Sequence, residues 1–161
     1  MTTLAERIEQ CLGGRAVLVV GVGNRLHGDD AAGSRVAEQL AAGGRECVFD
    51  AELSPENYLG VLLDASPEVV LFVDAAELGE TPGACRLAAI AELAPRVEST
   101  HMPSLRLAAD LLAAYGVESM LLGIQPGCTS ADTPLSPAVA AGVDEAARAI
   151  ARLLDREVCH G

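Results

Sequence analysis

The sequence predicts an α/β fold: a single three-layer domain, residues 1–161, in which a mostly parallel, twisted sheet of about five strands is flanked by helices on both faces. Two observations predict this architecture. Short apolar runs bounded by turn residues alternate with segments of helical periodicity, which is the order of strand-helix-strand units. Three of the apolar runs are continuous, as expected for strands that are buried on both faces of a parallel sheet.

The individual elements follow from the same patterns. The apolar runs predict strands at residues 16–22, 46–50, 69–74, 84–87 and 119–125. Helical periodicity is clearest where Val36 and Leu40 share one stripe and Gly43 marks the end of the helix. The predicted helices are residues 31–42, 57–64, 104–115 and 137–156. The last of them places its Val, Ile and Leu residues on one face, so we expect it to serve as scaffold.

Composition and charge restrict the partners. The net charge is −12 at pH 7, which repels nucleic-acid phosphates and anionic lipid surfaces, so we expect no nucleic acid and no membrane among the partners. All 11 basic residues are Arg, and the absence of Lys excludes P-loop and Schiff-base chemistry. The first residues show neither a signal peptide nor a membrane span, which predicts a cytoplasmic location. No exposed apolar stripe is evident in the periodic segments, which predicts a monomer.

The cysteines are expected to be reduced thiols. Five cysteines are scattered along the chain, and none of them forms a CxxC pair. This spacing argues against a zinc knuckle and against a disulfide framework.

The turn after the first strand, GVGNRLHGDDAAG at residues 21–33, is acidic. A dinucleotide-binding fingerprint would need a glycine at the position of Leu26, so the fingerprint fails. Asp29 and Asp30 stand where the helix N-terminus would otherwise receive a pyrophosphate, and their charges would repel it. Either Asp alone is explained as a helix cap. Because two adjacent acids exceed what capping requires, we assign Asp29 to the cap and Asp30 to a site for a cation.

Two further residues belong to the same edge of the predicted sheet. Asp74 ends a buried strand, where a carboxylate needs a hydrogen bond, a cation or a metal to offset the cost of its burial. His101 precedes the helix that Pro103 opens. Each residue also has an interpretation without a function. Asp74 could cap the following loop, and His101 could be an ordinary loop histidine. Together with Asp30 they form an oxygen, oxygen, nitrogen set that suits a borderline divalent ion, nickel or zinc above all.

These residues lie in segments that resemble the hydrogenase maturation proteases. The matching segments are GVGNRLHGDDAAG at 21–33, SPEN at 54–57, VDA at 73–75, STHMPSL at 99–105 and LGIQP at 122–126. Each piece is weak alone, but five in the same order and spacing are specific. The SPEN and LGIQP pieces look closest to the branch that processes formate hydrogenlyase hydrogenases. Residues 1–15 lie outside the resemblance and are predicted to be an N-terminal helical extension.

The resemblance implies a function. The family's metal-binding triad falls on Asp30, Asp74 and His101, with Asp30 and Asp74 as the catalytic carboxylates. The implied activity is an aspartic-type endopeptidase that removes the C-terminal extension of a nickel-iron hydrogenase large-subunit precursor after nickel insertion. The implied metal is nickel carried by the substrate, although the same ligands would also accept zinc or cadmium.

Two other classes of protein share part of the pattern. A Rossmann-like nucleotide-binding module without protease activity would use Gly21 and Gly23 to bind a nucleotide. The absence of the third glycine of that fingerprint and the presence of two adjacent acids argue against this class. A receiver-like switch would share the acids after the first and third strands, but it would lack its Lys.

Overall fold

The structure is a computed structural model that describes residues 1–93 and 99–159, and the backbone alone for residues 157–159. Its helices are α1 (Leu4–Leu12), α2 (Ala32–Ala42), α3 (Leu59–Asp64), α4 (Met102–Ala113) and α5 (Pro137–Cys159). Its strands are β1 (Val17–Gly21), β2 (Val48–Asp50), β3 (Val69–Ala75), β4 (Cys85–Ala89) and β5 (Glu118–Ile124). Three short 3-10 helices complete the fold: η1 (Gly28–Ala31), η2 (Pro55–Tyr58) and η3 (Ile90–Glu92).

The five strands form one sheet in the order β2-β1-β3-β5-β4. β1, β2, β3 and β5 run parallel, and β4 alone pairs antiparallel, with β5. The predicted fold class is therefore confirmed, with every strand within a few residues of its predicted position. Because β1, β3 and β5 are parallel, their carboxyl ends lie at one edge of the sheet, where open α/β sheets bind ligands.

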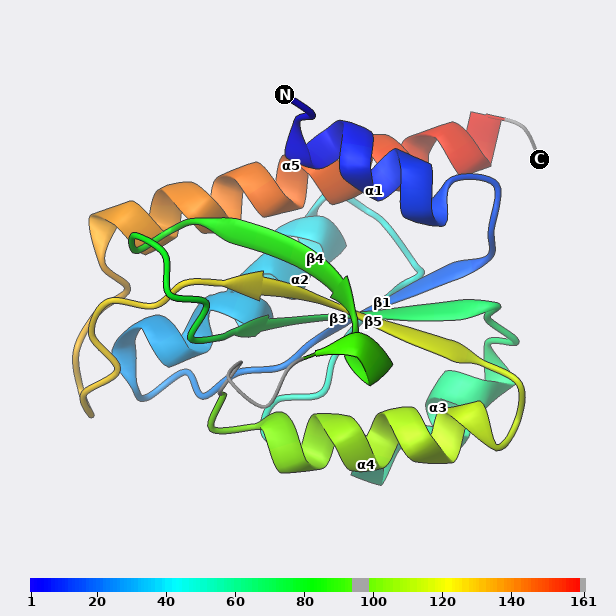
Figure 1. The fold of residues 1–161 in the computed structure, drawn as a ribbon, viewed down its shortest axis with the longest axis horizontal. Coiled ribbons are helices and arrows are strands. Elements are labelled where there is room, and N and C mark those ends of the chain that lie inside the picture. The colour runs from blue at the N-terminus through cyan, green and yellow to red at the C-terminus, as the bar shows by residue number, and fades with distance from the viewer. Residues whose placement is uncertain (94–98, 160–161) are drawn as a thin grey trace.

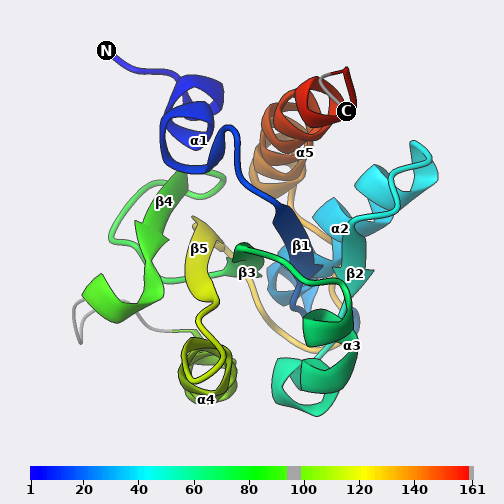
Figure 2. The ribbon, with the colours of Figure 1, turned by 90° about the vertical axis from the view of Figure 1, so that its right-hand side faces the viewer.

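Helices cover both faces of this sheet (Figures 1 and 2). α1, α2 and α5 pack on one face, and α3 and α4 pack on the other. In β3, Val69, Leu71 and Val73 point into the first layer, whereas Val70 and Phe72 point into the second. All five are fully buried. This double burial explains why the strand appears in the sequence as an unbroken apolar run.

The helices differ from the prediction mainly at their ends. α4 begins at Met102, two residues before the predicted start, with Pro103 in its first turn, where a missing N–H costs nothing. The predicted helix at 57–64 is divided into η2 and the shorter α3. α1 is opened by a capping box between Thr3 and Glu6, and it buries Ile8 against the same core as α5.

The surface does carry apolar side chains at helical spacing, contrary to the expectation from the periodic segments. Leu107, Leu111 and Tyr115 are exposed on and just beyond α4, at intervals of four residues. The argument that the chain lacks such a stripe was therefore wrong. In the described part of the chain, no helix is both long enough and apolar enough to cross a bilayer.

One glycine brings α2 unusually close to the sheet. A Cβ atom on Gly33 would lie 2.0 Å from the backbone oxygen of Val73 and 2.2 Å from that of Val22. Only a residue without a side chain allows this approach. The first turn of α2, which follows η1, is thereby held directly against the ends of β1 and β3.

Candidate metal centre

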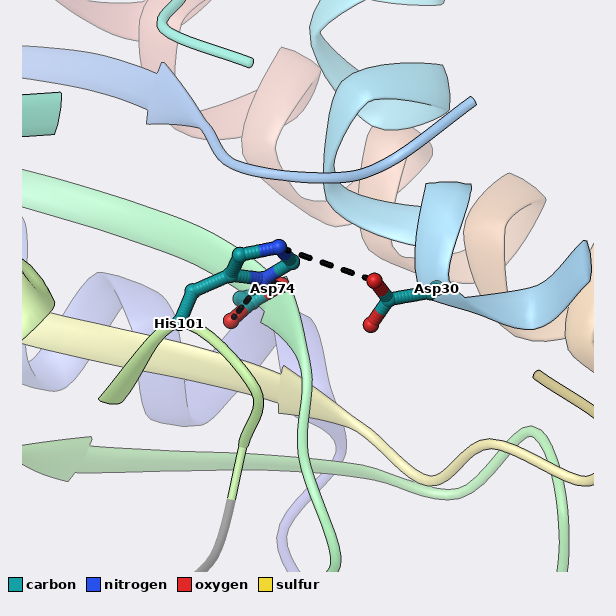
Figure 3. Close-up of side chains that lie close together, drawn as sticks. All are labelled: Asp30, Asp74 and His101. Carbon is teal, nitrogen blue, oxygen red and sulfur yellow. Dashed lines mark hydrogen bonds and ion pairs between the residues drawn. The ribbon is translucent and has the colours of Figure 1, made fainter. Parts of the chain in front are cut away.

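The structure brings Asp30, Asp74 and His101 together at the carboxyl edge of the sheet (Figure 3). The Nδ1 atom of His101 lies 3.1 Å from Oδ1 of Asp74, and its Nε2 atom lies 3.5 Å from Oδ2 of Asp30. One potential ligand atom from each residue can be chosen so that all three lie within 4.8 Å of one another. Three segments that are far apart in sequence, η1, the end of β3 and the start of α4, therefore converge on one point.

The fold explains each position. Asp74 follows Val70 and Phe72 on the face of β3 that α4 covers, so its side chain points toward the start of that helix. His101 is the residue immediately before α4. Asp30 belongs to η1, which leads into α2. All three are buried, and Asp74 is completely so, with 0% of its surface exposed.

Two hydroxyl side chains that the sequence analysis did not single out support the triad. Ser99 Oγ donates a hydrogen bond to Oδ2 of Asp74 at 2.5 Å and accepts one from the backbone N–H of His101 at 3.0 Å. Thr100 Oγ1 donates to Oδ1 of Asp30 at 2.9 Å. The signal in the sequence was the pair of hydroxyl residues directly before His101. Such outer contacts orient the groups that bind a metal.

Burial and mutual charge shift both titrating partners. Burial raises the pKa of Asp74 to about 6, although the hydrogen bonds from His101 and Ser99 oppose the rise. Burial lowers the pKa of His101, but the hydrogen bond to Asp74 and the charges of Asp74 and Asp30 outweigh it and leave that pKa raised. Above about pH 6 the Asp74 carboxylate is therefore mostly ionised, and the His101 imidazole beside it binds a proton more readily than an ordinary histidine does.

The charge balance of the centre favours a cation. Two buried carboxylates share one imidazole, and among the described residues no other cationic side chain forms an ion pair with either of them. Arg25 is engaged by Glu38 and Asp50 instead. Two carboxylate oxygens and one imidazole nitrogen are ligands for divalent transition metals, and three protein ligands leave positions open for a substrate group. The residues present therefore fit a nickel or zinc ion.

Asp29 has a different role from the one predicted. Neither η1 nor α2 has a side-chain cap, so the assignment of Asp29 to the cap was wrong. Its carboxylate instead accepts hydrogen bonds from the backbone N–H groups of Gly127, Cys128 and Ser136 and from the Ser136 hydroxyl. Burial alone would raise the pKa of Asp29, but these four hydrogen bonds lower it below its ordinary value.

The fold and the site define a three-layer α/β protein with a carboxylate and histidine centre at the carboxyl edge of its sheet. The chain belongs to the HycI family of hydrogenase maturation proteases, whose model matches residues 33–153. Asp74 and His101 lie inside this match, and Asp30 lies three residues before it. The family assignment makes the chain a peptidase and displaces the nucleotide-binding and receiver-like alternatives.

Individual relatives agree with this assignment. The chain is 32% identical over 126 residues to the hydrogenase 3 maturation protease of Escherichia coli K12. This alignment covers 76% of this chain and 81% of that protein. Over 134 residues it is 27% identical to a putative hydrogenase maturation protease of Methanocaldococcus jannaschii, covering 76% of this chain and 78% of the relative.

Solved structures show the same fold. The maturation protease HycI of Thermococcus kodakarensis superposes with a TM-score of 0.84 at 29% identity, covering 92% of this chain and 99% of that one. The solution structure of the endopeptidase HycI of Escherichia coli gives a TM-score of 0.72 at 27% identity, covering 88% and 91%.

Proposed function

We propose that this protein is an endopeptidase that removes the C-terminal extension of a nickel-iron hydrogenase large-subunit precursor once nickel has been inserted. One observation carries the proposal: Asp30, Asp74 and His101, from three separate segments of the chain, present two carboxylates and one imidazole within 4.8 Å of one another. The family membership supports the class of reaction and the class of substrate.

In this proposal nickel arrives as part of the substrate. Asp30 and Asp74 offer oxygen ligands and His101 offers a nitrogen ligand to an ion that the precursor already holds. Only a nickel-loaded precursor therefore binds tightly. Zinc and cadmium suit the same donors, and they serve as probes of the site. The excess of carboxylate over cationic charge supports this role, because an incoming divalent ion relieves the repulsion between the two acids.

Cleavage is hydrolysis of one peptide bond. The oxygen of a water molecule attacks the carbonyl carbon, the carbon-nitrogen bond breaks, and the water proton passes to the departing amine. In this proposal Asp30 and Asp74 accept that proton and return it, which makes the enzyme aspartic in type. A pKa of about 6 at Asp74 suits proton exchange near neutral pH. A bound divalent ion supplies polarisation of the scissile carbonyl.

The protein acts as a monomer in the cytoplasm in this proposal. Copies that each carry a net charge of −12 repel one another, which disfavours self-association. Cys11, Cys47, Cys85 and Cys128 are all free thiols, which fits a reducing compartment.

The test is cleavage of a purified, nickel-loaded precursor, followed by mass spectrometry of the large subunit. Asp74→Asn keeps the shape of the side chain but removes its charge, and we expect the rate to fall by about two orders of magnitude or more. Asp64→Asn is the matched control, since Asp64 is an exposed acid at the end of α3. Undiminished trimming by the Asp74→Asn variant, or equal trimming of a nickel-free precursor by the unchanged enzyme, would overturn the proposal.

A further inference from the structure

Two loops at the carboxyl edge of the sheet are fastened together by one buried carboxylate. Asp29, in the turn after β1, is fully buried. Its Oδ2 atom accepts hydrogen bonds from the N–H groups of Gly127 and Cys128 at 2.9 Å each and from Ser136 Oγ at 2.8 Å, and its Oδ1 atom accepts one from the Ser136 N–H at 2.7 Å. Both ends of the loop between β5 and α5 are thus tied to a single side chain.

The backbones of the two loops are also in direct contact. The N–H of Asp29 donates to the carbonyl of Cys128 at 2.9 Å, and the N–H of Asp132 donates to the carbonyl of Leu26 at 2.8 Å. Gly28 has a φ of +54°, and a Cβ atom on it would lie 2.5 Å from the backbone carbonyl oxygen of Cys128. Nothing larger than glycine fits this approach, so the turn and the loop form one unit.

Asp30 depends on this unit for its place. Its N–H donates to the carbonyl of His27, and its carbonyl accepts from the N–H of Asn24, both at 3.0 Å. Both of these backbone hydrogen bonds lie within the turn after β1. At the next residue back, the backbone and the carboxylate of Asp29 join that turn to the loop at residues 127–136. Asp29 therefore supports the position of the Asp30 carboxylate facing His101, in addition to the hydrogen bond that Thr100 Oγ1 donates to that carboxylate.

We propose that Asp29 is a positioning residue: it clamps the loop at residues 127–136 against the turn after β1, and thereby holds Asp30 in place for the loaded substrate. The inference rests on the proposed function for the role of Asp30, but the clamp itself does not. A carboxylate is required because its two oxygens accept four hydrogen bonds. An amide of the same shape offers one oxygen and turns an NH₂ group toward backbone donors.

Amide hydrogen exchange tests the clamp without any substrate. In the Asp29→Asn variant we expect exchange at Gly127, Cys128 and Ser136 to become at least about tenfold faster, and exchange at Asn24 and Asp30 to follow it. Asp132→Asn is the matched control, because it makes the same chemical change on an exposed side chain of the same loop. Acceleration spread evenly over the sheet, or confined to residues 127–136, would overturn the positioning role.

Kinetics with the nickel-loaded precursor test the consequence. We expect Asp29→Asn to raise KM about 10- to 100-fold, as is typical when the support of a metal ligand is removed. Partial unfolding would lower the maximal rate but would leave KM unchanged, so an unchanged KM argues against positioning. Ser136→Ala removes one of the four hydrogen-bond donors to Asp29 and should raise KM by a smaller factor. If Asp29→Asn does not fold, the hydrogen-exchange experiment is done with Ser136→Ala instead.

The two proposals fail in different ways. If the unchanged enzyme leaves the loaded precursor intact, the proposed function is wrong, and the exchange data alone decide whether Asp29 joins the two loops. If the unchanged enzyme cleaves but the Asp29→Asn variant shows normal exchange and normal KM, the clamp is wrong and the proposed function stands.

Discussion

The Nδ1 atom of His101 lies 3.1 Å from one oxygen of Asp74 and 3.2 Å from the other, so a single imidazole edge covers both oxygens of a fully buried carboxylate. This contact fixes the plane of the ring and directs Nε2 toward Asp30. A carboxylate behind a histidine is a common arrangement for setting the orientation of a metal-binding imidazole.

Replacing Asp74 with Asn should stabilise the protein while it slows cleavage by about two orders of magnitude or more. Burial raises the pKa of Asp74 to about 6, so keeping this group ionised in the folded state costs free energy. One pKa unit corresponds to about 1.4 kcal/mol, and the lost pairing with His101 offsets part of the gain, so we expect the free energy of unfolding to rise by about 1–2 kcal/mol at pH 8. Urea unfolding measures this difference.

The pH dependence of the stability contribution of Asp74 is opposite to that of a typical acidic residue, whose pKa is lowered by folding. A carboxyl group with a raised folded-state pKa favours the fold below its ordinary pKa, and that contribution is lost as the pH rises through about 6. The stability advantage of Asp74→Asn should therefore disappear by about pH 4, where Asp74 is itself protonated. An advantage that persists unchanged at that pH, or a destabilised variant at pH 8, would contradict the assignment.

The rate of precursor cleavage should fall in acid. Protonation of Asp74 removes an oxygen ligand and a proton acceptor together, so kcat/KM should decline about tenfold for each pH unit below about 6. The profile is measured with loaded precursor and with the folded fraction checked at every pH. A flat profile down to pH 5 would exclude a titrating role for this carboxylate.

Asp29 should make the fold sensitive to acid in the ordinary direction. Its hydrogen bonds from Ser136, Gly127 and Cys128 lower its pKa, so its contribution to stability is present above the ordinary carboxyl pKa and is lost as the pH falls through the lower folded value. The unchanged protein should therefore lose more stability between about pH 5 and pH 2 than Asp29→Asn, which lacks this group. Equal losses, measured by urea unfolding across that range, would show that Asp29 does not titrate as described.

The sequence could reveal the parts of the site that depend on local patterns. Asp74 was visible because a carboxylate ends an unbroken apolar run, and parallel strands bring such ends to one edge. The partners of Asp29 were not visible, since Gly127 and Ser136 lie about a hundred residues away, and only the packing of the two loops brings them together. A lone Asp beside a helix start looks the same in sequence whether it caps the helix or binds a distant loop.

The same limit applies to the edge of the sheet and to the supporting hydroxyls. β4 was predicted as a strand, but its antiparallel direction depends on how the chain returns to β5 after residue 75, which apolar periodicity does not encode. Ser99 and Thr100 are ordinary loop residues in sequence. They acquire a role only because the start of α4 is placed against the end of β3.

Substituting Gly33 with Ala should loosen the site from a distance. The added methyl group would meet the backbone oxygens of Val73 and Val22, which cannot rotate away, so α2 must move off the sheet and take Asp30 with it. We expect a loss of about 1–3 kcal/mol in the free energy of unfolding and weaker binding of the loaded precursor. Gly60→Ala is the matched control: it places the same methyl group in open space on α3, where it should stabilise by about 0.4–1 kcal/mol. If urea unfolding shows the two variants to be equally stable, α2 does not depend on this close approach, and Asp30 is held in place by its other contacts.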